Sequence, residues 1–108
     1  MKYALLAYNP LDVDRSAPIK PEIAEALRRL NVTSWARLQP AGSATTISSS
    51  GGKTLLTDGP FIDSKEYLGG LIIIEAANLD EALAIATEFQ SMMATGGALE
   101  VRPILEAG

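Results

Sequence analysis

Two strand-length segments of this chain are apolar at almost every position, and they constrain the fold more than any other feature. Lys2–Tyr8 reads KYALLAY, and Leu71–Ala76 reads LIIIEA. A strand with one face in water alternates apolar and polar residues, whereas a strand buried on both faces reads as a nearly continuous apolar run. We therefore expect both segments to be central strands of a sheet whose two faces are covered.

Two further segments carry the signals of amphipathic helices. Pro21 suits the first turn of a helix, and Asn31 is a typical C-terminal stop ten residues later. In the second helix, Asn78 followed by Glu81 has the spacing of a capping box. Apolar residues with helical spacing follow each start: Ile23, Leu27 and Leu30 in the first helix, and Ala82, Ile85, Ala86, Phe89 and Met93 in the second.

The remaining segments add strands and one short helical turn. The sequence predicts strands at Val32–Leu38 and Leu99–Ile104, a β-hairpin formed by Ala44–Ser49 and Lys53–Thr57, and a helical turn at Asp63–Leu68 that ends at Gly69-Gly70. The Gly51-Gly52 pair suits the hairpin turn. Pro103 indicates an edge position for the last strand, because proline cannot donate a hydrogen bond to a neighbouring strand.

This order of elements predicts an α+β fold in a single domain, residues 1–108: a ferredoxin-like split βαβ unit with an added β-hairpin. Two helices can cover only one face of the sheet, so another surface must hide the other apolar face. We expect a second copy of the chain to do so, which gives a homodimer with sheets packed face to face. The alternative is a monomer whose open face is covered by the hairpin and the Pro10–Ala17 loop.

Composition excludes several kinds of chemistry. The 108 residues include no Cys and no His, so a zinc–thiolate site, a Cys nucleophile and a Ser–His triad are ruled out. We expect no metal and no cofactor. The net charge of −4 does not suit a duplex-binding protein, so we expect no nucleic-acid partner. The longest apolar runs are too short to span a membrane, and we expect a cytoplasmic protein.

The segment Thr57–Gly70, TDGPFIDSKEYLGG, resembles the motif of the YCII-related family, in the branch with a DGPF tetrapeptide. The opening strand, the hairpin segments, the second helix and the closing strand resemble that family as well. The resemblance implies a ferredoxin-like fold that dimerises into an α/β barrel, and it implies no established reaction. Members of the wider family are proposed to use a His–Asp pair. Because this chain has no His, that mechanism does not transfer to it.

Four residues are the candidates for a site near the DGPF turn. Asp58 is the candidate general base, although an Asp in a turn often only caps backbone N–H groups. Lys65, Arg102 and Tyr8 are candidates for binding substrate; the alternatives are a solvated Lys65, a salt bridge from Arg102 to Glu75 or Glu100, and core packing of Tyr8.

Two functions follow from these residues. In the first, the protein is an enzyme that uses Asp58 to move a proton on a small aromatic or carboxylated metabolite. In the second, it is a non-catalytic dimeric module that binds a ligand or a protein. The residues leave this choice open.

Overall fold

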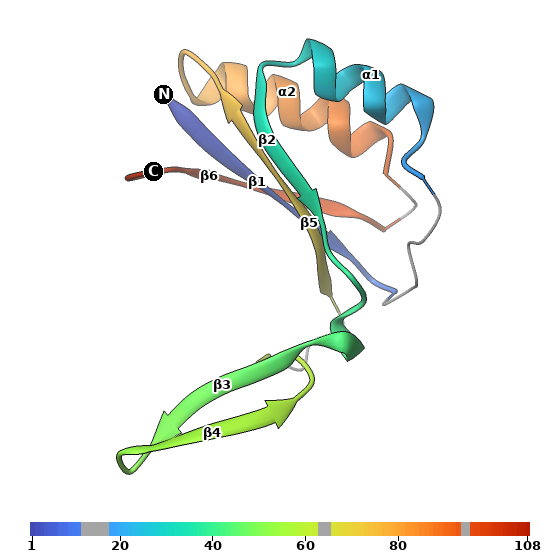
Figure 1. Ribbon diagram of the computed structural model, residues 1–108. Helices are drawn as coiled ribbons and strands as arrows, with labels where there is room; N and C mark the ends of the chain where they lie inside the picture. Colours follow the sequence, from blue (N-terminus) through green and yellow to red (C-terminus); the bar gives the residue numbers. More distant parts are fainter. Residues whose placement is uncertain (12–17, 63–65, 94–95) are drawn as a thin grey trace.

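The computed structural model describes residues 1–11, 18–62, 66–93 and 96–108 (Figure 1). The described elements, in chain order, are β1 (Lys2–Asn9), α1 (Pro21–Arg29), β2 (Val32–Arg37), the 3₁₀ turn η1 (Ala41–Ser43), β3 (Thr45–Ser50), β4 (Lys53–Asp58), β5 (Tyr67–Glu75), α2 (Leu79–Ser91) and β6 (Ala98–Pro103). The α+β class predicted from the sequence is therefore confirmed.

The main sheet has the strand order β2-β5-β1-β6, and each neighbouring pair of strands is antiparallel. This is the order of a split βαβ unit. The two continuously apolar segments lie in β1 and β5, at the centre of the sheet, as predicted. β6 is an edge strand, in agreement with the position of Pro103.

Both helices pack on one face of this sheet (Figure 1). Leu5 of β1 and Ile74 of β5 have no solvent exposure, and they anchor the core between the sheet and the helices. The buried residues of this core are Tyr3, Leu5, Ala26, Ile74, Ala76, Ala82, Ile85, Ala86 and Phe89. Burial of these side chains is the main favourable contribution to folding.

The other face of the sheet is apolar, and no described helix covers it. Strand register places Leu6 opposite Leu71 in β5 and opposite Glu100 in β6, and Leu71 opposite Ala36 in β2. Side chains alternate along a strand, so these residues point away from the helix-facing Leu5. We call this surface the open face; its members are Lys2, Ala4, Leu6, Tyr8, Ser34, Ala36, Leu68, Leu71, Ile73, Glu75, Ala98, Glu100 and Arg102, so its centre is apolar and its ends carry polar side chains.

The helix ends are formed by the residues that predicted them. Pro21 occupies the first turn of α1, and Asn31 follows the helix with φ 57°, the left-handed conformation that commonly terminates a helix. At the start of α2, the Asn78 side chain accepts a hydrogen bond from the Glu81 backbone N–H at 2.9 Å. These interactions span only a few residues, which explains why the sequence predicted them.

The predicted helical turn at Asp63–Leu68 is wrong at its C-terminal end. Residues 63–65 lie outside the described part of the chain, but Tyr67 and Leu68 belong to β5, and so do Gly69 and Gly70. A bulge lies here: Ala7 pairs with Gly70, whereas Tyr8 pairs with Leu68. Glycines inside a strand are typical of a bulge or of close backbone approach, and they do not end this element.

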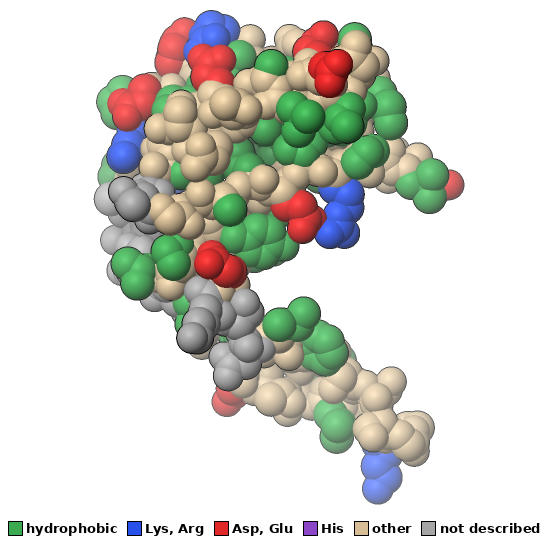
Figure 2. All heavy atoms as spheres, turned by 180° about the vertical axis from the view of Figure 1, so that it is seen from behind, with side chains coloured by type: hydrophobic (Ala, Val, Ile, Leu, Met, Phe, Trp, Pro, Cys, Tyr) green, Lys and Arg blue, Asp and Glu red, His purple; other side chains and the backbone are tan. Residues whose placement is uncertain are grey.

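The β3–β4 hairpin projects from the end of the main sheet, away from both helices (Figure 1). Its strands pair with each other and with no strand of the main sheet, and Gly51 and Gly52 form its turn with φ of 56° and 79°. We call residues 45–58 the arm. The arm does not cover the open face of its own chain, since a hollow separates the two in Figure 2.

Among the residues that the structure describes, no helix is long and apolar enough to cross a membrane. The cytoplasmic location stays a prediction.

Candidate functional site

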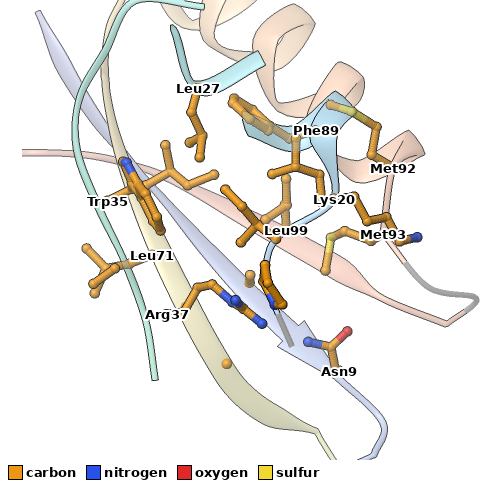
Figure 3. A pocket seen from close by; sticks show the side chains of 18 residues that line it. Asn9, Lys20, Leu27, Trp35, Arg37, Leu71, Phe89, Met92, Met93 and Leu99 are labelled. Atoms are coloured by element: carbon orange, nitrogen blue, oxygen red, sulfur yellow. The ribbon is translucent and has the colours of Figure 1, made fainter. Parts of the chain in front are cut away.

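A pocket of about 410 Å³ lies between the helices and the main sheet. It opens near the ends of β1 and β2, at the N-terminus of α1 and the C-terminus of α2 (Figure 3). Pockets that hold small organic ligands have volumes of roughly 300–1,000 Å³, so this one lies at the lower end of that range.

The interior of the pocket is apolar. Its walls come from both helices and from all four strands of the main sheet. The large apolar side chains among the lining residues include Ile23 and Leu27 of α1, Trp35 of β2, Ile72 of β5, Phe89 of α2, Met92 and Met93 after it, and Leu99 of β6. Aromatic rings and flexible thioethers together suit a flat or irregular apolar ligand.

Strand register directs Trp35 and Arg37 to the same face of the sheet. The two residues are two positions apart on β2, opposite Ile72 and Gly70 of β5. Ile72 packs against the core on the helix side of the sheet. Trp35 therefore supplies a wall of the pocket, and the guanidinium of Arg37 points from β2 across its mouth (Figure 3).

Two other polar residues lie at the mouth. Lys20 is the N-cap residue of α1, and its carbonyl oxygen accepts hydrogen bonds from the N–H groups of Ile23 and Ala24 at 3.0 Å each. Its ammonium group is directed outward beside Met93 (Figure 3). Asn9, the last residue of β1, adds a side-chain amide.

Among the described residues, both charged side chains at the mouth are basic. Lys20 and Arg37 carry positive charge, and none of the described residues that line the pocket is acidic. Arginine presents planar, paired N–H donors that match a carboxylate. The arrangement can hold a small molecule with an apolar body and an anionic group, the body inside and the anion at the mouth.

Gly70 brings β2 and β5 unusually close beside this pocket. A Cβ atom built on Gly70 would lie 2.9 Å from the carbonyl oxygen of Ala36, closer than real side chains approach. The N–H of Leu38 donates to the carbonyl of Gly69 at 2.8 Å and extends the pairing past the end of β2. These contacts fix the backbone that carries Arg37.

Of the four residues predicted for a site, none lines this pocket among those that the structure describes. Asp58 ends β4 at the base of the arm and is exposed; among the described residues, its side chain accepts no hydrogen bond. Lys65 lies outside the described residues. Arg102 lies on the open face and pairs with Glu100, the salt bridge that the sequence offered as an alternative. Tyr8 lies on the open face and is half-buried.

One chain thus brings Tyr8 and Arg102 to the same face but does not gather them with Asp58 in a pocket. The proposed proton transfer by Asp58 stays a prediction.

Sequence reasoning missed Arg37 and Lys20. The signal for Arg37 was present, since it follows Trp35 by two residues in a predicted strand and so shares its face. Lys20 carried no such signal, because only the packing of α1 against the sheet brings it beside Met93. Neither residue lies in the DGPF segment, which carries the family resemblance.

The chain was compared with known proteins. The model of the YCII-related domain matches residues 1–107. An uncharacterized protein of Rhizobium meliloti (strain 1021) is 37% identical over 115 aligned positions, which cover 96% of this chain and 92% of that protein. Nearly the full length of the chain is included in both matches. The chain belongs to the YCII-related family.

Proposed function

We propose that this protein is a homodimeric small-molecule binding protein whose ligand is a small carboxylate with an aromatic or aliphatic body. The pocket that Trp35 and Arg37 line is the binding site. The observation that carries the proposal is the pairing of an apolar interior with a basic mouth: Phe89 and Leu99 lie inside, and Arg37 lies at the entrance.

The charge of the mouth favours an anion over a neutral ligand. A hydrogen bond to a charged group contributes about 1.5–3 kcal/mol, which corresponds to roughly tenfold or more in affinity. We therefore expect the carboxylate to supply selectivity and the apolar body to supply most of the binding free energy.

The fluorescence of Trp35 can be used to measure ligand binding. It is the only tryptophan of the chain, and it lines the pocket, so intrinsic fluorescence reports on occupancy. The probes are phenylacetate and octanoate, each compared with its neutral amide. We expect each carboxylate to change the fluorescence of Trp35 and to bind about tenfold more tightly than the corresponding amide.

Two variants test whether Arg37 causes the preference for carboxylates. Arg37→Gln keeps a polar side chain of similar length without its charge, and it should abolish the preference for carboxylates over amides. Arg28→Gln is the matched control, because Arg28 is exposed on α1, pairs with Glu25 at 2.6 Å and does not line the pocket. Equal binding of carboxylates and amides to the parent protein would contradict the anionic part of the proposal. No fluorescence change with either class would contradict the binding site itself.

The proposal of a homodimer is based on the open face of the sheet. Leu6 and Ile73 are half-buried there in one chain, with no described helix over them. A second copy of the chain packed over this face would remove the apolar surface from water, and a two-fold axis lets each copy cover the face of the other. The test is light scattering at micromolar concentration: a mass of twice 11.4 kDa is expected, and a mass of 11.4 kDa contradicts the dimer.

A further inference from the structure

We infer that the arm, residues 45–58, is exchanged between two copies of the chain, so that each arm packs over the open face of its partner. The inference rests on the proposed homodimer and names the element that holds it together. It concerns a surface distinct from the pocket, so the ligand proposal does not depend on it.

The first observation is that the arm carries large apolar side chains that the described part of its own chain leaves exposed. Ile47 of β3 and Leu56 of β4 are a directly opposed pair, and they are 70% and 72% exposed. Leu55, on the other face of the arm, is 45% exposed. Aromatic and aliphatic side chains continue beyond the arm, where Phe61 is 79% exposed. Large apolar side chains exposed to this extent are typical of an interaction surface.

The second observation is that the arm lacks the support that a hairpin needs. An isolated two-stranded hairpin is at best marginally stable in water, and it needs a third strand or a packed face. Both outer edges of the arm are unpaired within the described sheet. Natural edge strands are usually protected by charges, proline or bulges. The arm carries only two charged residues, Lys53 at its tip and Asp58 at its base.

The third observation is the shape of the chain. The arm and the body enclose a hollow that is open on one side, and hydrophobic side chains lie on both sides of it (Figure 2). Six residues in each strand give the arm a length of about 20 Å, which matches the width of about 19 Å expected for a four-stranded sheet. The arm is thus long enough to cross the main sheet of a partner.

A second copy of this chain is the occupant that satisfies all three observations. Each copy has one projecting apolar arm and one uncovered apolar sheet face, and the hollow keeps the two apart within a chain. A two-fold axis lets each copy give an arm and receive one, so both surfaces are buried in a single assembly. The tip residue Lys53 then meets a partner whose net charge is −4.

Hydrogen exchange combined with the solution mass tests the exchange in the unmodified protein. At concentrations where the mass is twice 11.4 kDa, we expect the backbone amides of residues 45–58 to be protected. On dilution to the monomer, the arm should lose that protection while β1 and β5 retain theirs. A dimer with an unprotected arm overturns the arm exchange and leaves the homodimer standing. A monomer at micromolar concentration, with or without a protected arm, overturns both.

A pair of double variants separates the arm from a general loss of apolar surface. Ile47→Ser with Leu56→Ser removes the exposed pair of the arm, and we expect it to raise the dissociation constant of the dimer by about tenfold or more. Leu79→Ser with Leu83→Ser is the matched control, because these residues are 48% and 43% exposed on α2. Circular dichroism checks that both variants fold. An unchanged dissociation constant in the arm variant contradicts the inference.

Cross-linking identifies which surface the arm contacts. Since the chain has no Cys, single-cysteine variants react only at the introduced site. A Leu56→Cys copy mixed with an Ile73→Cys copy should form a covalent dimer with a short bismaleimide. The same arm variant mixed with Leu79→Cys, on α2, should not. Equal yields in the two mixtures, or no product in either, would place the arm elsewhere and overturn the inference.

Discussion

Arg29, the last residue of α1, donates a hydrogen bond from its guanidinium to the Glu88 carboxylate of α2. The two residues are 59 positions apart in the chain, and their ion pair links the two helices that cover the pocket. The hydrogen bond to Glu88 and then its negative charge raise the pKa of Arg29 above the usual value for arginine. Both side chains are about half exposed, so solvent screens this attraction strongly.

Arg29→Gln should lower the melting temperature only slightly, and the difference from the parent should shrink as salt is added. A raised pKa of a basic group contributes stability that is present below its unfolded pKa and lost only as the pH rises through the folded pKa. For arginine this window lies far above neutral pH. The difference in melting temperature should therefore be the same at pH 7 and pH 9. A difference that falls between these two pH values would contradict this assignment.

Gly70→Ala should destabilise the protein by about 1–3 kcal/mol, the usual cost of forcing extra atoms into a packed site. The new Cβ would lie 2.9 Å from the Ala36 carbonyl oxygen, which is backbone and cannot rotate away. Urea unfolding gives the change in the free energy of unfolding. Gly108→Ala is the control, because a Cβ there meets nothing within 4 Å and should leave stability unchanged. Parent-like stability of Gly70→Ala would show that β2 can move away from β5.

Asn78→Ala should cost about 1 kcal/mol of stability, since it leaves the Glu81 backbone N–H without the acceptor that caps α2. Asn78→Asp supplies the same acceptor and adds a negative charge at the helix N-terminus, so it should restore the loss. Thermal or urea unfolding of the parent and the two variants measures these changes in stability. If Asn78→Asp were as unstable as Asn78→Ala, the capping hydrogen bond would not be the cause.

Asp58→Asn should leave the affinity of the pocket for phenylacetate unchanged, because Asp58 lies at the base of the arm and not among the residues that line the pocket. Fluorescence of Trp35 measures this affinity with the same titration as for the parent. A marked loss of affinity would indicate that Asp58 reaches a bound ligand, as it could from a partner chain. That result would revive the catalytic prediction for Asp58.

The sequence by itself determined the elements whose causes lie within a few residues. The ends of the helices are set by local backbone geometry and capping at Pro21, Asn31 and Asn78. The two apolar runs lie in the central strands because both faces of those strands require apolar residues. The resemblance to the YCII-related family was also readable from the sequence, and membership of that family is confirmed. None of these conclusions needed a contact between distant residues.

The tertiary structure alone decided where the site lies. Lys20, Arg37 and Met93 come from separate segments, and only the packing of helices on the sheet gathers them at one mouth. The start of β5 escaped prediction for the same reason. Gly69 and Gly70 read as a stop, but both belong to β5, and the close approach of β2 at Gly70 leaves no room for a side chain there. A local sequence pattern indicates the backbone conformation that a residue prefers. The pocket and the position of the arm depend instead on contacts between segments that are distant in the sequence.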